Sequence, residues 1–360
     1  MPDEWFVRVE GKEYGPVDLE TLLEWKAEGR LIPQNEVRAE ADERWLPASQ
    51  FPELFAVSPD LQTRPDRLFR RRTFSEIMSE TLRIYARGFP QFFALALFVA
   101  VPSLVMQISF GFASFQQGEA VDVRSRIAGV VAVLALAALL VCWPIFVAGL
   151  QFAAAELAAG RKAKLRDVLR QAVGVWPRMA RLSLFVYGSY LFWTLLPVVL
   201  ILSLASTPSA LALLVAMLAL GLQVYMAGRL FVNFLFWQQS CTLAGLDGAE
   251  ALRESKDLAR SRRDMPAVQR PAYRGAIIAS VWLVVLVAAS VAVEMPFTVM
   301  RLRGVGTMEE AITLMQQLLS APTPDALTLA SNVLSSLVHA ALRPLLGIAF
   351  VVLYFDARGE

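Results

Sequence analysis

Residues 89–112 read FPQFFALALFVAVPSLVMQISFGF, a continuous run without a charged side chain. A helix rises about 1.5 Å per residue, so about 20 apolar residues cross the hydrocarbon core of a bilayer. Five further apolar stretches lie near 128–151, 182–204, 208–231, 276–298 and 333–355. The sequence therefore predicts six membrane-spanning helices.

The composition agrees with a membrane class. Hydrophobic residues make up 56% of the 360 residues and charged residues only 18%, whereas about 25% charged residues is usual in soluble proteins. The net charge of +2 is too small to indicate a nucleic-acid partner. The expected partner of most of the chain is the lipid bilayer.

Positive charges lie on alternate connections between the apolar stretches. The segment before the first stretch, residues 64–87, carries seven Lys or Arg residues, and so do the connections after the second and fourth stretches. On the opposite side, the connection after the first stretch carries Arg124 and Arg126, and the connection after the fifth carries Arg301 and Arg303. The connection after the third stretch has no Lys or Arg. The positive-inside rule then places both termini in the cytoplasm. The first 20 residues also lack the apolar core of a signal peptide, which favours a cytoplasmic N-terminus.

Three segments on the positively charged side have helical amphipathic spacing. They are residues 74–85, 165–175 and 249–259, and each leads toward an apolar stretch. One interpretation is three independent interfacial helices whose arginines face lipid headgroups. The other is a threefold repeat of an amphipathic helix followed by a helical hairpin. The sequence leaves both open.

Residues in the same region carry a family resemblance. The segments are Arg72-Thr-Phe-Ser-Glu-Ile through Tyr85, Gly248-Ala-Glu-Ala-Leu-Arg-Glu-Ser255, and Leu353-Tyr-Phe-Asp-Ala-Arg358. Together they resemble six-span bacterial proteins related to the glycerophosphoryl diester phosphodiesterase membrane domain, over roughly residues 73–358. The resemblance implies a helical fold in a bacterial inner membrane. The catalytic barrel that names that family has no counterpart in the sequence, so no hydrolase activity is expected.

The segment before the membrane region has the pattern of a small α+β domain. Residues 5–10 alternate as in a strand, Gly11-Lys12 and Gly15-Pro16 have turn composition, and Asp18 is a suitable N-cap for a helix that ends at Gly29. Residues 36–38 and 44–48 fit two further short strands. We expect a domain at 1–57, a linker at 58–72 and a six-span region at 73–360.

This N-terminal segment resembles the bacterial GYF-like domain of the GYF_2 type across its full length. The matching elements are Tyr14-Gly-Pro16, Trp25, Gly29 and Trp45-Leu-Pro-Ala48. GYF domains bind proline-rich peptides, so the resemblance makes Tyr14, Gly15, Pro16 and Trp25 candidate peptide-binding residues.

The signature Gly-Tyr-Phe of that family is absent, because Arg30 and Leu31 follow Gly29. An alternative interpretation therefore assigns Trp5, Trp25 and Trp45 to the core of a domain that is too small to be stable without large aromatic residues.

The sequence offers little for catalysis, metal or cofactor binding. There is one histidine, and Cys142 and Cys241 lack the spacing of a metal site or a redox pair. Neither a phosphate-binding glycine loop nor a nucleophile elbow is found. We expect no enzymatic activity and no cofactor.

Three polar residues occur within or near the last two apolar stretches. His339 and Arg343 are four residues apart and share a helix face, and Glu294 is a candidate counter-ion for Arg343. Alternatively, the sixth span begins near Leu342, and Arg343 extends outward to the headgroups.

Two hypotheses for function follow. In the first, the GYF-like domain recruits a cytoplasmic protein, and the six helices act as a membrane-anchored adaptor or scaffold. In the second, the chain is a carrier or channel-like protein with a polar site at His339, Arg343 and Glu294 that the N-terminal domain regulates.

Overall fold

The structure is a computed structural model of the full chain. It describes residues 4–9, 12–27, 30–32, 34–40, 44–48, 51, 54, 69–112, 122–205, 209–303, 307, 310 and 325–359. The chain divides into two compact units, unit 1 at Met1–Asp66 and unit 2 at Arg67–Glu360. Most of the expected linker, and Gly11 and Gly29 of the N-terminal segment, lie outside the described residues.

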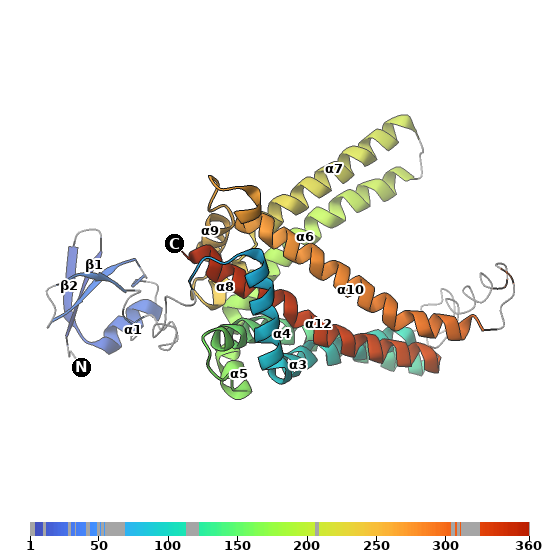
Figure 1. The fold of residues 1–360 in the computed structure, drawn as a ribbon, viewed down its shortest axis with the longest axis horizontal. Coiled ribbons are helices and arrows are strands. Elements are labelled where there is room, and N and C mark those ends of the chain that lie inside the picture. The colour runs from blue at the N-terminus through green and yellow to red at the C-terminus, as the bar shows by residue number, and fades with distance from the viewer. Residues whose placement is uncertain are drawn as a thin grey trace. The chain divides into compact units, whose positions relative to one another are not determined.

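In its described residues, unit 1 is a four-stranded antiparallel sheet with one helix (Figure 1). Its elements are β1 (Trp5–Val9), β2 (Lys12–Val17), α1 (Leu19–Ala27), β3 (Glu36–Ala39) and β4 (Leu46–Pro47). The strand order is β2-β1-β3-β4, so β2 and β4 are the edge strands. The side chain of Asp18 accepts a hydrogen bond of 2.9 Å from the backbone N–H of Thr21, which confirms it as the cap of α1.

One face of this sheet packs against α1 to form a small core. The buried residues are Trp5, Val7, Leu22, Leu31, Val37, Ala39, Ala48 and Leu54. Trp25 packs against this core while remaining half-buried. The expected turn at Gly15-Pro16 is wrong, because both residues lie within β2, where the pairing with β1 shifts register.

Unit 2 is entirely helical among its described residues. The long helices are α3 (Phe74–Phe112), α4 (Val123–Ala158), α6 (Trp176–Ala205), α7 (Ala210–Asn233), α10 (Pro271–Arg301) and α12 (Ala326–Arg358). The shorter elements are α5 (Leu165–Gly174), α8 (Trp237–Thr242), α9 (Gly248–Ala259) and the 3₁₀ helix η3 (Ala267–Gln269). Within the part of unit 2 that the structure describes, six helices are long and apolar enough to cross a membrane. The predicted fold class, a small α+β domain followed by a six-helix membrane bundle, is confirmed.

The long helices pack as three hairpins, α3 with α4, α6 with α7, and α10 with α12. An amphipathic helix precedes each hairpin: the first turns of α3, then α5, then α9. At the entry into the first span of each hairpin the chain carries a proline, namely Pro90 just after the kink at Gly88, Pro177 and Pro271. Proline fits the first turn of a helix because it has no N–H to satisfy there. The order of elements is the one that the repeat interpretation predicts.

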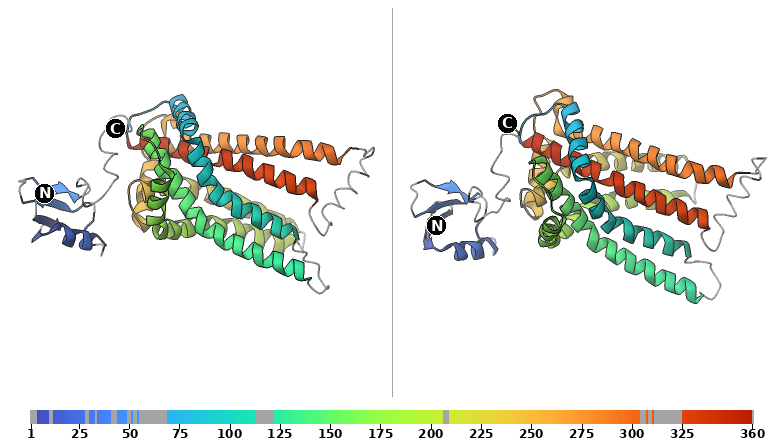
Figure 2. Two further views of the ribbon diagram at one scale, coloured as in Figure 1. Left: turned by 90° about the horizontal axis from the view of Figure 1, so that it is seen from below. Right: turned by 60° about the horizontal axis from the view of Figure 1, so that its bottom comes forward.

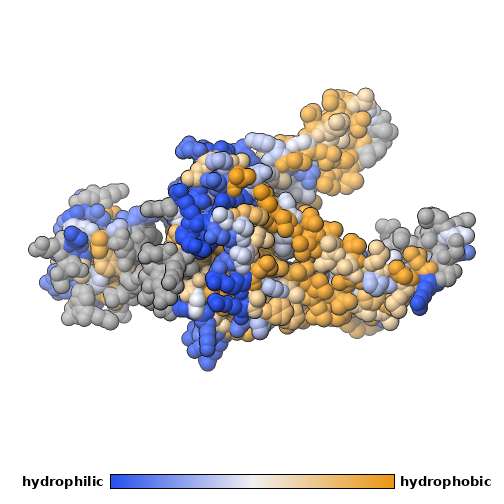
Figure 3. All heavy atoms as spheres, in the orientation of Figure 1, coloured by the Kyte–Doolittle hydropathy of each residue, from blue (hydrophilic) through white to orange (hydrophobic). Residues whose placement is uncertain are grey.

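Polar and apolar residues occupy different zones of unit 2. Both views of Figure 2 show the long helices extending away from the end that holds the C-terminus. In Figure 3 hydrophilic residues gather at that end, and hydrophobic residues cover the helices beyond it. We call it the polar end, and it comprises residues 69–88, 159–181, 242–274 and 354–359 of the described chain.

Candidate functional site

The candidate residues Tyr14, Gly15 and Pro16 lie exposed on the edge strand β2. The side chain of Tyr14 is 46% exposed. Gly15 has a φ of +138°, and a Cβ there would lie 2.6 Å from the backbone oxygen of Trp5. Only glycine fits this position, so the Gly-Pro pair sets the backbone path that leaves the Tyr14 ring in solvent.

Trp25 has a second neighbour besides the core. The guanidinium carbon of Arg30 lies 5.0 Å from the centroid of the Trp25 ring, a cation–π geometry. Leu31, next in the chain, is buried in the core. The two residues that replace the aromatic pair of the GYF signature therefore support the domain: one covers Trp25 and the other fills the interior.

The opposite face of the sheet carries a layer of arginines and aromatic rings that we did not predict from the sequence. Arg8 lies 4.0 Å from the Trp45 ring centroid, and Arg38 lies 4.7 Å from that of Phe6. Arg8 also forms an ion pair of 2.6 Å with Glu13, and this hydrogen bond raises the pKa of Arg8. Trp45 is thus half-buried because it stacks on Arg8 at this outer face, and it is not one of the core residues.

The intramembrane candidates are only partly brought together. The ring Nε2 of His339 lies 2.9 Å from the hydroxyl of Ser290 on α10. The guanidinium carbon of Arg343 lies 5.9 Å from the ring centroid of Trp143 on α4. Glu294 is exposed on α10, and among the described residues it forms no ion pair with Arg343. Its role as the counter-ion of Arg343 stays a prediction.

Three glutamines form a buried hydrogen-bonded group between α4 and α8. The amide Nε2 of Gln151 donates to Gln238 at 3.0 Å, and that of Gln239 donates to Gln151 at 3.1 Å. Gln151 and Gln239 are almost fully buried. Amides in an apolar region are costly unless they bond to one another, so this group ties α8 firmly to α4.

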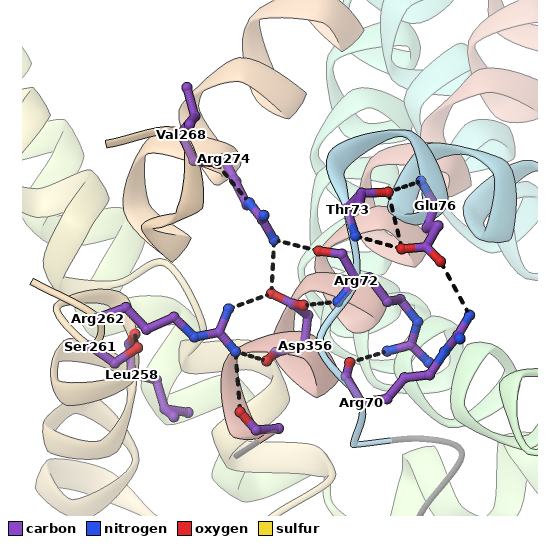
Figure 4. Close-up of polar contacts among 11 residues, drawn as sticks. Arg70, Arg72, Thr73, Glu76, Leu258, Ser261, Arg262, Val268, Arg274 and Asp356 are labelled. Carbon is purple, nitrogen blue, oxygen red and sulfur yellow. Dashed lines mark hydrogen bonds and ion pairs between the residues drawn. The ribbon is translucent and has the colours of Figure 1, made fainter. Parts of the chain in front are cut away.

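Among the described residues of unit 2, an extensive polar contact surrounds Asp356 at the polar end (Figure 4). Its carboxylate accepts hydrogen bonds from Arg262 at 2.9 Å, from Arg274 at 3.1 Å and from the backbone N–H of Arg72 at 2.6 Å. Arg262 also donates to the backbone oxygens of Asp356 and Gly359. We call the group Arg72, Arg262, Arg274 and Asp356 the Asp356 clasp.

The arginines of the clasp are themselves held by the backbone. Arg274 donates to the oxygen of Val268 at 2.8 Å and to that of Arg72 at 2.9 Å. The carboxylate is fully buried, and the two paired arginine side chains are 9% exposed. Burial lowers the pKa of the Arg72 guanidinium, and the positive charge of Arg70 lowers it further. The clasp therefore concentrates positive charge around one buried carboxylate.

The three sequence segments that carry the membrane-family resemblance meet at this place. Arg72 begins the first segment, and Thr73 and Glu76 form a reciprocal capping box that starts α3. Glu254 of the second segment forms an ion pair with Arg358 of the third. The segments lie far apart in the sequence, but together they fix the polar end.

Comparison with known families gives one match to the N-terminal part. The model of the family GYF domain 2 matches residues 5–54. No curated protein and no solved structure matches the chain. The relationship of the helical part to the phosphodiesterase membrane-domain family stays a prediction. Among the described residues, no group of three or more His, Cys, Asp or Glu side chains is placed to hold a metal ion.

Proposed function

We propose that the protein is a membrane-anchored adaptor of the bacterial inner membrane, in which the GYF-like domain recruits a cytoplasmic protein through a proline-containing peptide. Six helices able to cross a membrane and a GYF domain match at 5–54 are consistent with a multi-pass membrane protein. The observation that carries the recruitment role is the exposed Tyr14-Gly15-Pro16 segment on an edge strand.

The chemistry of that segment suits an extended proline-rich ligand. Such ligands adopt the polyproline II helix, and they dock with low entropic cost on exposed aromatic rings. The Tyr14 ring supplies an exposed aromatic surface, and Pro16 beside it adds an apolar one. Arg30 covers part of Trp25, so we assign the main contact to Tyr14 and a supporting contact to Trp25.

The test uses the full chain in native membranes, with crosslinking and affinity recovery of bound proteins. We expect Tyr14→Ala to reduce recovery of the partner by at least about tenfold, because removal of an aromatic hot spot costs about 2 kcal/mol or more. The matched control is Trp45→Ala, since Trp45 is an aromatic residue on the opposite face of the same sheet.

The expected control result is unchanged recovery with Trp45→Ala, in a chain whose domain remains folded by circular dichroism. A deletion of residues 1–57 should abolish recovery. If the deleted chain recovers the same proteins as the full chain, the domain is not the recruiting surface and the adaptor proposal fails.

A further inference from the structure

Arg343 carries a positive charge near the middle of α12 and lacks a counter-charge in the described part of the chain. Its Nη1 atom is buried without a hydrogen-bond partner. The ion pairs of the described residues do not include it. A charge within a membrane helix is expensive, and it normally pairs with another group or faces water. An anionic group would satisfy this donor and balance the charge.

Arg343 faces Trp143, the first of a row of aromatic residues from three other helices. Trp143 of α4, which the guanidinium faces, packs against Tyr187 of α6, and Tyr187 packs against Trp237 of α8; each pair of ring centroids is 6.0 Å apart. One turn further along α12, Gly347 lies so close to α4 that a Cβ would be 2.2 Å from the side chain of Leu150. Arg343 thus faces α4, and Trp143 connects this place to the aromatic residues of α6 and α8.

A polar stripe on α12 leads to this position. Asn332, Ser336, His339 and Arg343 follow one another at intervals of four, three and four residues, so they share one helix face. All four are half-buried, and His339 contacts Ser290 of α10. The stripe gives a polar headgroup several hydrogen-bonding groups along its length, with the charge at one end.

Several helices of unit 2, including α10 beside this stripe, leave apolar surfaces uncovered. In Figure 1, α6 and α7 diverge from α10 and α12, and in Figure 3 apolar residues cover both arms with open space between their outer ends. In the most apolar 18 residues of α7 and of α10, only 6% is buried, whereas 39% is buried in the corresponding part of α12. Acyl chains can therefore reach the region beside the charged site.

We infer that Arg343 binds the phosphate of an anionic membrane lipid, with the headgroup along the polar stripe of α12 and the acyl chains against the exposed apolar helices. The planar guanidinium can donate two parallel hydrogen bonds to a phosphate, and its contact with Trp143 holds it in place. An anionic amphiphile supplies both an anion for Arg343 and apolar chains for the exposed helices.

The first test measures lipid retention by the full chain, extracted in mild detergent and examined by native mass spectrometry. The wild-type chain is expected to retain phosphatidylglycerol in preference to phosphatidylcholine. Arg343→Gln should lower this retention by at least about tenfold, because a charge-assisted hydrogen-bonded pair is lost. Arg343→Lys keeps the charge without the planar fork, so intermediate retention is expected.

The matched control is Arg229→Gln, the same change at an exposed arginine of α7, and retention should stay at the wild-type level. Equal retention by the Arg343→Gln and wild-type chains would overturn the inference. Displacement of the lipid by soluble glycerol phosphate would also overturn it, since the ligand would then be a soluble anion.

A second test keeps Arg343 in place, in case its replacement prevents folding. The full chain is placed in phosphatidylcholine nanodiscs that contain a minor fraction of a brominated lipid, and quenching of Trp143 is taken as the difference from a Trp143→Phe chain. Brominated phosphatidylglycerol should quench Trp143 more strongly than brominated phosphatidylcholine at the same fraction. Equal quenching by the two lipids would refute a site selective for anionic headgroups.

Discussion

Asp356 is the residue whose loss should most affect unit 2. Its fully buried carboxylate neutralises two nearly buried arginines. Asp356→Asn keeps the shape but removes the charge, which leaves Arg262 and Arg274 uncompensated. Removing one partner of a buried ion pair costs about 3–5 kcal/mol. We expect a lower midpoint of unfolding when the detergent-solubilised chain is titrated with a denaturing detergent and followed by tryptophan fluorescence.

The control for this prediction is Asp247→Asn. Asp247 forms an ion pair of 2.7 Å with Arg181, but both side chains are substantially exposed. It also caps α9, and asparagine caps a helix about as well as aspartate. An exposed pair contributes about 1 kcal/mol at most. If both substitutions shift the midpoint equally, the clasp has no special role.

Asp18 predicts a pH dependence in unit 1. Hydrogen bonds from Thr21 lower the pKa of the Asp18 carboxyl. The folded pKa then lies below the unfolded value of about 3.9, so this contribution to stability is present above about pH 4 and is lost as the pH falls through the folded pKa. We expect the free energy of unfolding of residues 1–66 to fall less steeply with decreasing pH, below about pH 4, in the Asp18→Asn chain than in the wild type. The same dependence on pH in both chains would show that other carboxyls dominate it.

At the residue scale, the sequence indicated the role of individual residues better than it indicated which residues they contact. Asp18 as a cap followed from local chemistry and is confirmed. Asp356 was expected just beyond the last span, and it lies in the last turn of α12, but its full burial was not predicted. Its partners lie 82 to 284 residues away in the chain, so no local pattern indicates them. The one hint in the sequence of a polar contact here was the acidic residue Asp356, directly after the last apolar stretch.

At the element scale, Gly88 separates the amphipathic start of α3 from its apolar part. Its backbone departs from helical geometry, and a Cβ there would lie 2.3 Å from Leu157 and 2.7 Å from Phe92. Gly88→Ala should therefore overpack the contact of α3 with α4 and destabilise unit 2 by about 1–3 kcal/mol. Thermal unfolding of the purified chain in detergent measures the change.

Gly129→Ala is the matched change within α4, where no atom lies within 4 Å of the added Cβ. Alanine favours a helix over glycine by about 1 kcal/mol, so the melting temperature should stay the same or rise. A similar loss of stability for both variants would argue against packing at Gly88 as the cause.

Apolar length and amphipathic spacing were enough to predict most helices. Each of the six apolar stretches corresponds to a long helix, although the fourth helix begins at Ala210 rather than 208. The Gln151, Gln238 and Gln239 group was missed, because Gln151 is a single amide in an apolar span and the adjacent Gln238 and Gln239 lie 87 and 88 residues further along the chain. Only the packing of α8 against α4 brings them together.

At the scale of the whole molecule, the distribution of positive charge predicts the orientation. We expect the polar end to face the cytoplasm, because the arginine-rich connections lie there. Single cysteines are introduced at Asp122 and Asp264, both exposed, in a chain with Cys142→Ser and Cys241→Ser. A membrane-impermeant maleimide should label Asp122→Cys in intact cells and Asp264→Cys only after permeabilisation. The reverse pattern would invert the proposed topology and place the GYF-like domain outside the cell.

The Asp356 clasp has a further consequence for the connectivity of the chain. Because the backbone of Arg72 binds the carboxylate of Asp356, the first and last described segments of unit 2 lie side by side. The chain thus enters and leaves the three hairpins at nearly the same place. A chain with residues 1–66 moved behind Gly359 would attach the small domain to unit 2 at almost the same point. Evolution could therefore exchange the attached domain at either terminus without rebuilding the membrane part.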